Sequence, residues 1–151
     1  MNETTTLRRL LAAILFLGML GSATELLLLE HDEEVLQVAP LVLIGLAVVV
    51  LSVAVVRPSA AVVRTVQVTM LLFILAGVAG AVLHFRANME FQQEMDPAIA
   101  RWDLFWKVMH AKAPPALAPG VMVQLGLLGL VFSYRHPSIE SPVAQSTKGR
   151  M

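Results

Sequence analysis

Hydrophobic side chains along the chain gather into four long apolar stretches that are separated by short charged segments. The stretches cover residues 10–29, 38–56, 62–83 and 116–132. Each is close to the ~20 residues that a helix needs to cross a hydrocarbon core. None shows the alternation of polar and apolar residues that is typical of a membrane barrel strand. The pattern therefore predicts an all-α fold, an integral membrane four-helix bundle formed by residues 1–136.

The segment between the third and fourth stretches is amphipathic. We expect a helix over residues 97–111, with Asp96 as its cap and Pro97 in its first turn. Asp103 and Lys107 have the spacing of an ion pair within one helix. One side of this helix collects apolar side chains, namely Ile99, Trp102, Trp106 and Met109. Two placements remain open for this helix. It can lie in the water–lipid interface on the outer side of the membrane, with its tryptophans at headgroup depth, or it can cap the mouth of the bundle.

Two further segments extend beyond the spans. The sequence from Arg86 to Glu94 contains no Gly or Pro, so the third helix can continue past the membrane. The tail of residues 137–151 is polar and contains Pro and Ser, which predicts a disordered cytoplasmic segment.

Composition supports the membrane interpretation. The 151 residues are 57% hydrophobic, with a mean hydropathy of +0.73. A soluble domain of this size could not bury four apolar faces, because its surface is too large for its volume. The absence of cysteine excludes disulfides, thiolate metal sites and redox dithiols.

Charge is distributed unevenly although the net charge is zero. One predicted side has seven basic and two acidic side chains, a balance of +5: Arg8, Arg9, Arg57, Arg64, Arg135, Lys148 and Arg150 against Glu3 and Glu140. The other side has four basic and nine acidic side chains, a balance of −5: Arg86, Arg101, Lys107 and Lys112 against Glu25, Glu30, Asp32, Glu33, Glu34, Glu90, Glu94, Asp96 and Asp103. The positive-inside rule therefore predicts a multi-pass protein of the cell membrane with both termini in the cytoplasm.

The N-terminus allows a second interpretation. Arg8 and Arg9, the apolar run of residues 10–20 and the small residues 21–23 resemble a cleavable secretory signal. Apolar sequence resumes at residues 26–29, however, which makes the stretch longer than a signal core. We therefore prefer an uncleaved first span.

Small residues mark the faces by which the helices are expected to pack. The first span carries Gly18, Gly21, Ser22 and Glu25 on one side, and the third carries Gly77, Gly80, Ala81, His84 and Asn88. In the fourth span, Gly126 and Gly129 also suit close packing. On both the first and third spans, small residues are followed by polar residues at the outer end.

These outer ends supply the candidate site. Our first hypothesis is a polar packing cluster of Glu25, His84 and Asn88, which fixes the arrangement of the helices. Our second is a metal site built from imidazole and carboxylate groups: Glu25, His31, His84, Glu90 and Glu94. Such a site would suit Zn, Fe, Mn or Cu, but the Glu-x-x-His pair of dinuclear bundles is absent from the sequence.

No sequence motif indicates an enzyme, a phosphate-binding loop or a nucleic-acid partner. We therefore expect a non-enzymatic accessory or interaction subunit, whose partners are the lipid bilayer and either another membrane protein or a second copy. The alternative is an extracytoplasmic metal-binding or ion-handling membrane protein. No cofactor is favoured, and a transition metal belongs only to that alternative.

Overall fold

The computed structural model describes residues 3–28, 35–111 and 117–140, and these contain helices and turns but no strand. The helices of this part of the chain are α1 (Glu3–Leu28), α2 (Val35–Val56), α3 (Ala60–Met95), α4 (Arg101–Met109) and α5 (Leu117–Ser133). Three of them, α1, α2 and α3, are long and apolar enough to cross a membrane, and α5 is a shorter apolar helix. The prediction of an all-α fold is confirmed for these residues.

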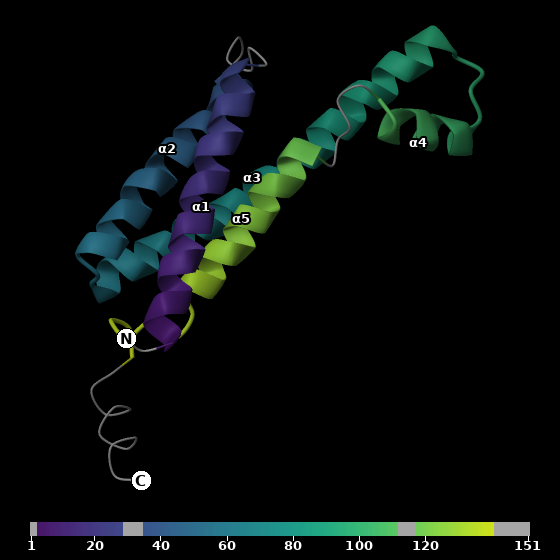
Figure 1. The fold of residues 1–151 in the computed structure, drawn as a ribbon. Coiled ribbons are helices and arrows are strands. Elements are labelled where there is room, and N and C mark those ends of the chain that lie inside the picture. The colour runs from purple at the N-terminus through teal and green to yellow at the C-terminus, as the bar shows by residue number, and fades with distance from the viewer. Residues whose placement is uncertain (1–2, 29–34, 112–116, 141–151) are drawn as a thin grey trace.

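Four of the helices form a closed ring (Figure 1). The α1 helix contacts α2 and α5, and α3 contacts the same two helices. Each helix contributes buried side chains to a shared core, which includes Leu15, Met19, Ala47, Leu51, Met70, Phe73, Met122 and Leu125.

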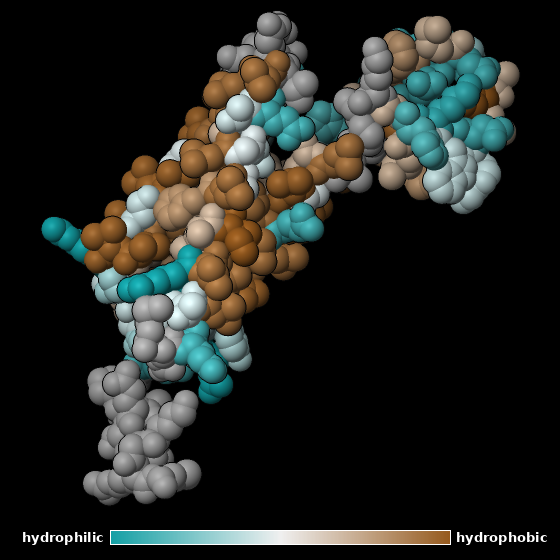
Figure 2. Space-filling view, viewed as in Figure 1, coloured by the Kyte–Doolittle hydropathy of each residue, from teal (hydrophilic) through white to brown (hydrophobic). Residues whose placement is uncertain are grey.

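The outward surface of this ring is also apolar. Leu17, Leu28 and Val56 are each at least 75% exposed. Figure 2 shows hydrophobic residues over most of the visible face of the ring. A water-soluble monomer rarely exposes so large a continuous apolar surface, whereas lipid solvates it.

Glycines allow α3 and α5 to approach closely. A β-carbon added at Gly77 would lie 2.6 Å from the carbonyl oxygen of Pro119, and one added at Gly126 would lie 2.7 Å from that of Met70. A β-carbon at Gly129 would collide with the Met70 side chain. The predicted role of Gly77, Gly126 and Gly129 in close packing agrees with these contacts. Gly21 differs, because nothing lies within 4 Å of its missing β-carbon.

The α3 helix is much longer than a membrane crossing. Ser59 caps its start, since its hydroxyl oxygen accepts a hydrogen bond from the Val62 N–H at 3.2 Å. The helix then continues for 36 residues, about 54 Å at 1.5 Å per residue. It thus extends twelve residues beyond the predicted span end at residue 83, as the lack of Gly and Pro between Arg86 and Glu94 had indicated.

The predicted start of the next helix is wrong. Asp96 ends α3 instead of opening α4, because its N–H donates to the Gln92 carbonyl at 3.1 Å. A turn follows, in which the Ile99 N–H donates to the Asp96 carbonyl, and α4 begins only at Arg101. The helix is therefore shorter than the predicted residues 97–111. Lys107 approaches Asp96 at 3.9 Å instead of forming the predicted pair with Asp103.

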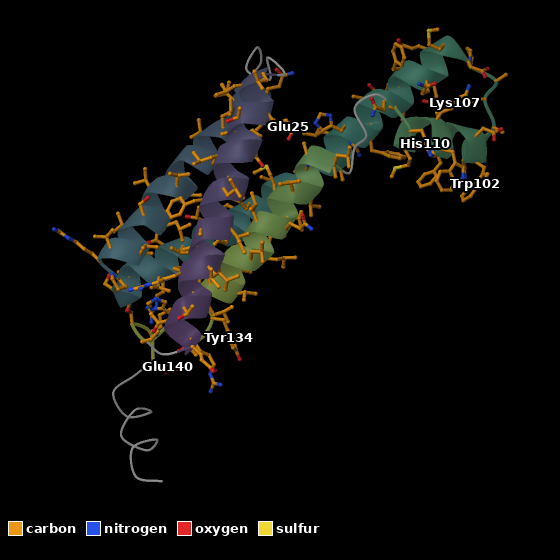
Figure 3. All side chains as sticks on the ribbon, in the orientation of Figure 1. Glu25, Trp102, Lys107, His110, Tyr134 and Glu140 are labelled. Carbon is orange, nitrogen blue, oxygen red and sulfur yellow. The ribbon has the colours of Figure 1, made fainter. Side chains whose placement is uncertain are left out.

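The α4 helix packs by a face other than the predicted one. Leu104 and Val108 are its buried residues, and among the described residues α4 contacts only α3. The helix folds back beside the end of α3, away from the ring (Figure 1), so it does not cap the mouth of the four helices. Trp102, Phe105 and Trp106 form an aromatic face with ring centroids 5.4–5.7 Å apart, and all three are exposed. Figure 3 shows Trp102 on the side of α4 that points away from α3.

Hydrogen bonds join the start of α1 to the residues that follow α5. The Arg8 guanidinium donates to the carbonyl oxygens of Tyr134 and Arg135, at 3.3 and 2.9 Å. These oxygens follow the last turn of α5, where a cation offsets the negative end of the helix dipole. Arg135 has a φ of 45°, the left-handed conformation that often ends a helix. The first residues of the predicted tail, 137–140, form turns, with the Ile139 N–H donating to the His136 carbonyl at 2.9 Å.

Some predicted features lie outside the described residues. These are His31 of the proposed metal set, charged residues that were assigned to the acidic side (Glu30, Asp32, Glu33, Glu34 and Lys112), and the tail from residue 141 onward.

Candidate functional site

A cavity of about 390 Å³ lies among the four helices of the ring, at the end opposite to Arg8. Its described lining comes from all four helices: Ser22, Glu25 and Leu26 of α1, Gln37 and Pro40 of α2, Ala76, Gly80, Leu83, His84 and Ala87 of α3, and Ala118, Pro119 and Met122 of α5. The volume falls within the ~300–1,000 Å³ that is usual for small-molecule sites.

Small residues and prolines create this space. On α3, Ala76, Gly80, His84 and Ala87 recur every three or four residues and so share one face. At Gly80, an added β-carbon would meet Pro119 only at ordinary contact distance, 3.5 Å. Pro119 is the third residue of α5, where its missing N–H costs no helical hydrogen bond, so it does not interrupt the helix.

Pro40 has a different effect, because it lies inside α2, at the sixth residue of the helix. Proline there removes one helical backbone hydrogen bond, because its nitrogen carries no hydrogen. Pro40 also forms part of the apolar lining of the cavity.

Among the described residues, the polar lining consists of one carboxylate, one imidazole, one amide and one hydroxyl, from Glu25, His84, Gln37 and Ser22. The remaining described lining is apolar and includes neither Lys nor Arg. Glu25 is exposed, so a ligand can reach its carboxylate without separating the helices. Figure 3 shows Glu25 near the end of α1, on the side toward α3.

Ion pairing does not neutralise Glu25 within the described ranges. The salt bridges found there join Lys107 to Asp96 and Arg135 to Glu140, and no hydrogen-bond partner of the Glu25 carboxylate occurs among these residues. The carboxylate therefore stands beside a largely apolar cavity without a counter-ion from residues 3–28, 35–111 or 117–140.

The structure brings together part of the predicted site. Glu25 and His84, which both hypotheses share, line the same cavity. Asn88 lies one turn further along α3 and does not line it, although it makes polar contacts of its own. Glu90 and Glu94 are exposed on the extension of α3 and do not line the cavity. In the described part of the chain, no three His, Asp or Glu side chains lie close enough together to hold a metal ion.

Sequence reasoning missed Gln37 as a lining residue. The sequence contained a weak indication of this role: Gln37 is the polar residue in the first turn of α2, a helix whose other polar side chain is Ser52 near its opposite end. Ser22 was recognised as a small packing residue, and the cavity gives its hydroxyl a second role as a polar group in the lining.

A second polar cluster occupies the opposite end of the ring, just after α5. His136 is only 8% exposed, and its ring Nδ1 accepts a hydrogen bond from the Ser138 N–H at 3.2 Å. Burial lowers the pKa of His136 below its ordinary value of 6.5, and the nearby Arg8 charge lowers it further. The neutral imidazole is therefore favoured in the folded protein.

Comparison with protein-family models, curated proteins and solved structures yields no match to this chain. Function is therefore inferred from the cavity and from the surfaces of the helices.

Proposed function

We propose that the protein is a four-span membrane protein with both termini in the cytoplasm, and that it acts by binding, as a non-enzymatic accessory or interaction subunit. Its binding element is the polar cluster at the extracytoplasmic end, with Glu25 and His84 at the cavity and Asn88 beside it. The observation that carries this proposal is the cavity itself, whose described lining combines polar side chains of α1, α2 and α3 with largely apolar walls.

The bilayer is the first partner. Three helices have the length and hydropathy of membrane spans, and their outward surfaces are apolar. The α5 helix has 17 residues, about 25 Å of helix, which is at the lower limit for a crossing. Its contacts with both α1 and α3 support its placement in the membrane alongside them.

The contact of Arg8 with the end of α5 supports an even number of crossings. It joins the first turns of α1 to the carbonyl groups after α5, so the start of α1 and the end of α5 lie on the same side of the ring. The balance of +5 on this side and −5 on the other then favours a cytoplasmic location for both termini.

Topology can be tested directly because the chain contains no cysteine. Single-cysteine variants Thr5→Cys, Ala60→Cys, Gln93→Cys and Tyr134→Cys each place a thiol at an exposed position. In intact cells, a membrane-impermeant maleimide should label only the Gln93 variant, and the other three should react after permeabilisation. Labelling of the Tyr134 and Gln93 variants from the same side would contradict the fourth crossing.

The metal-binding alternative concerns the same cavity, since Glu25 and His84 both line it. Metal analysis of detergent-purified protein separates the two roles, with wild type and His84→Ala measured in parallel. Stoichiometric metal that is lost in the variant would favour metal binding. A lower unfolding temperature of the variant, with no metal in either sample, would favour the packing and interaction role, because polar contacts between membrane helices contribute about 0.6–2 kcal/mol.

A further inference from the structure

The charge and shape of the cavity indicate which class of molecule it can hold. Its walls are formed largely by aliphatic side chains, such as Leu26, Leu83 and Met122. A polar or multiply charged solute would lose its hydration there without adequate compensation. The cavity therefore favours a ligand with an apolar body.

The carboxylate of Glu25 indicates the charge of that ligand. Glu25 has no ion pair with the described residues, and their share of the lining contains no Lys or Arg. The basic residues of α1, Arg8 and Arg9, lie about 24–26 Å away along the helix, given 16 or 17 intervening steps of 1.5 Å. Glu25 is exposed beside the cavity, so a cation can approach its carboxylate, and opposite charges attract more strongly next to apolar walls than in bulk water.

A metal ion fits a cavity with apolar walls and one described carboxylate poorly. Divalent ions require several nitrogen or oxygen ligands, and no group of three His, Asp or Glu side chains gathers within the described ranges. A monovalent organic cation needs only one carboxylate for its charge, and apolar walls for its body. Ser22, Gln37 and His84 add polar groups that can accept or donate hydrogen bonds to its head.

We propose that the cavity binds a small hydrophobic cation, such as a quaternary or protonated amine with an apolar substituent, and that Glu25 is its counter-ion. This inference deepens the proposed function, since it names the ligand of the same polar cluster. It rests on that binding role and does not depend on the number of membrane crossings.

The test uses two probes of the same shape, of which only one is charged. Benzyltrimethylammonium is the cation, and neopentylbenzene is its neutral carbon analogue. Binding of each to the full-length protein in detergent is measured by equilibrium dialysis, with protein-free micelles as the blank. We expect saturable binding of the cation and no saturable binding of the neutral analogue. Equal binding of both probes, or no binding of the cation, would overturn the proposal.

Variants then assign the binding to the cavity. Glu25→Gln removes the charge and should weaken binding of the cation about tenfold or more. Ala87→Leu keeps Glu25 but fills the cavity from α3, and should also weaken binding. Asp103→Asn, which removes an exposed carboxylate from α4, is the matched control and should bind as the wild type does.

Three results would count against the assignment. Unchanged binding in the Glu25→Gln variant would overturn the role of the carboxylate, and unchanged binding in Ala87→Leu would overturn the location. Stoichiometric displacement of the cation by Zn²⁺, abolished by His84→Ala, would favour a metal site instead. The cysteine-labelling experiment is independent of all three, so a failure of the ligand assignment can be distinguished from a failure of the topology.

Discussion

Substitution of Gly126 by alanine tests the close approach of α3 and α5. The new β-carbon would lie 2.7 Å from the Met70 carbonyl oxygen and 3.2 Å from the Ile74 backbone nitrogen. Both neighbours are backbone atoms, so no change of rotamer relieves the contact with them. Ordinary contact begins at 3.4 Å, which means that the two helices must separate by about 0.7 Å.

A separation of this size is costly in a membrane protein. Helices in lipid associate chiefly through van der Waals packing and polar contacts, because the lipid is as apolar as the helices themselves. A gap of about 0.5–1 Å already loses a quarter to a half of the attraction between facing atoms. We therefore expect Gly126→Ala to lower the free energy of unfolding by about 1–3 kcal/mol, the usual cost of overpacking.

The matched control is Gly45→Ala on α2. Nothing lies within 4 Å of a β-carbon at this position, and alanine favours the helix by about 1 kcal/mol over glycine. The control should therefore be neutral or slightly stabilising. Unfolding of both variants in mixed detergent micelles, followed by far-UV circular dichroism, measures the difference. If Gly126→Ala and Gly45→Ala unfolded at the same denaturant concentration, the geometry of the α3–α5 contact would be refuted.

Three further predictions concern other parts of the molecule. Arg8→Gln, which removes the guanidinium from the carbonyl groups after α5, should lower the unfolding free energy by about 1 kcal/mol in the same assay, whereas Arg64→Gln at an exposed position should have little effect. The pKa of His136 is lowered on folding, so the unfolded chain binds more protons, and stability should fall as the pH drops below about 6.5. A profile across this range that is the same for His136→Gln as for the wild type would contradict the prediction. The only two tryptophans, Trp102 and Trp106, lie on the exposed aromatic face of α4, so their fluorescence should be quenched by lipids brominated near the headgroup and much less by lipids brominated near the chain ends. Quenching by neither lipid would place α4 outside the interface.

Hydrophobic periodicity and length were sufficient to predict the apolar helices. The predicted fourth stretch, residues 116–132, differs from α5 by only one residue at each end. The lack of Gly and Pro between Arg86 and Glu94 correctly indicated that α3 continues. Both features depend on residues that are close together in the sequence, so one sequence is enough to predict them.

The segment around α4 shows where local signals were insufficient. Asp96 and Pro97 have the chemistry of a helix start, but the preceding helix uses Asp96 as its end and a turn follows. The α4 helix also has two apolar sides that could pack against a neighbouring helix, one with Leu104 and Val108 and one with Trp102 and Trp106. Only the position of α3 decides that Leu104 and Val108 are buried while the tryptophans remain exposed.

The candidate site was predictable to a similar extent. Glu25 and His84 share a depth in the membrane that can be counted from the sequence, and both line the cavity. The exclusion of Glu90 and Glu94 from the lining, and the inclusion of Gln37, depend on how the helices are rotated about their axes. A single sequence does not specify that rotation.

The length of α3 links two regions that the sequence keeps apart. This helix runs without interruption from its Ser59 cap to the turn that precedes α4, and its middle carries Ala76, Gly80 and His84 of the cavity wall. A continuous helix transmits a tilt along its whole length, as a lever does. A displacement of α4 that tilted α3 would therefore shift one wall of the cavity relative to Glu25 on α1. The helix thus provides one continuous connection between α4 and the cavity wall.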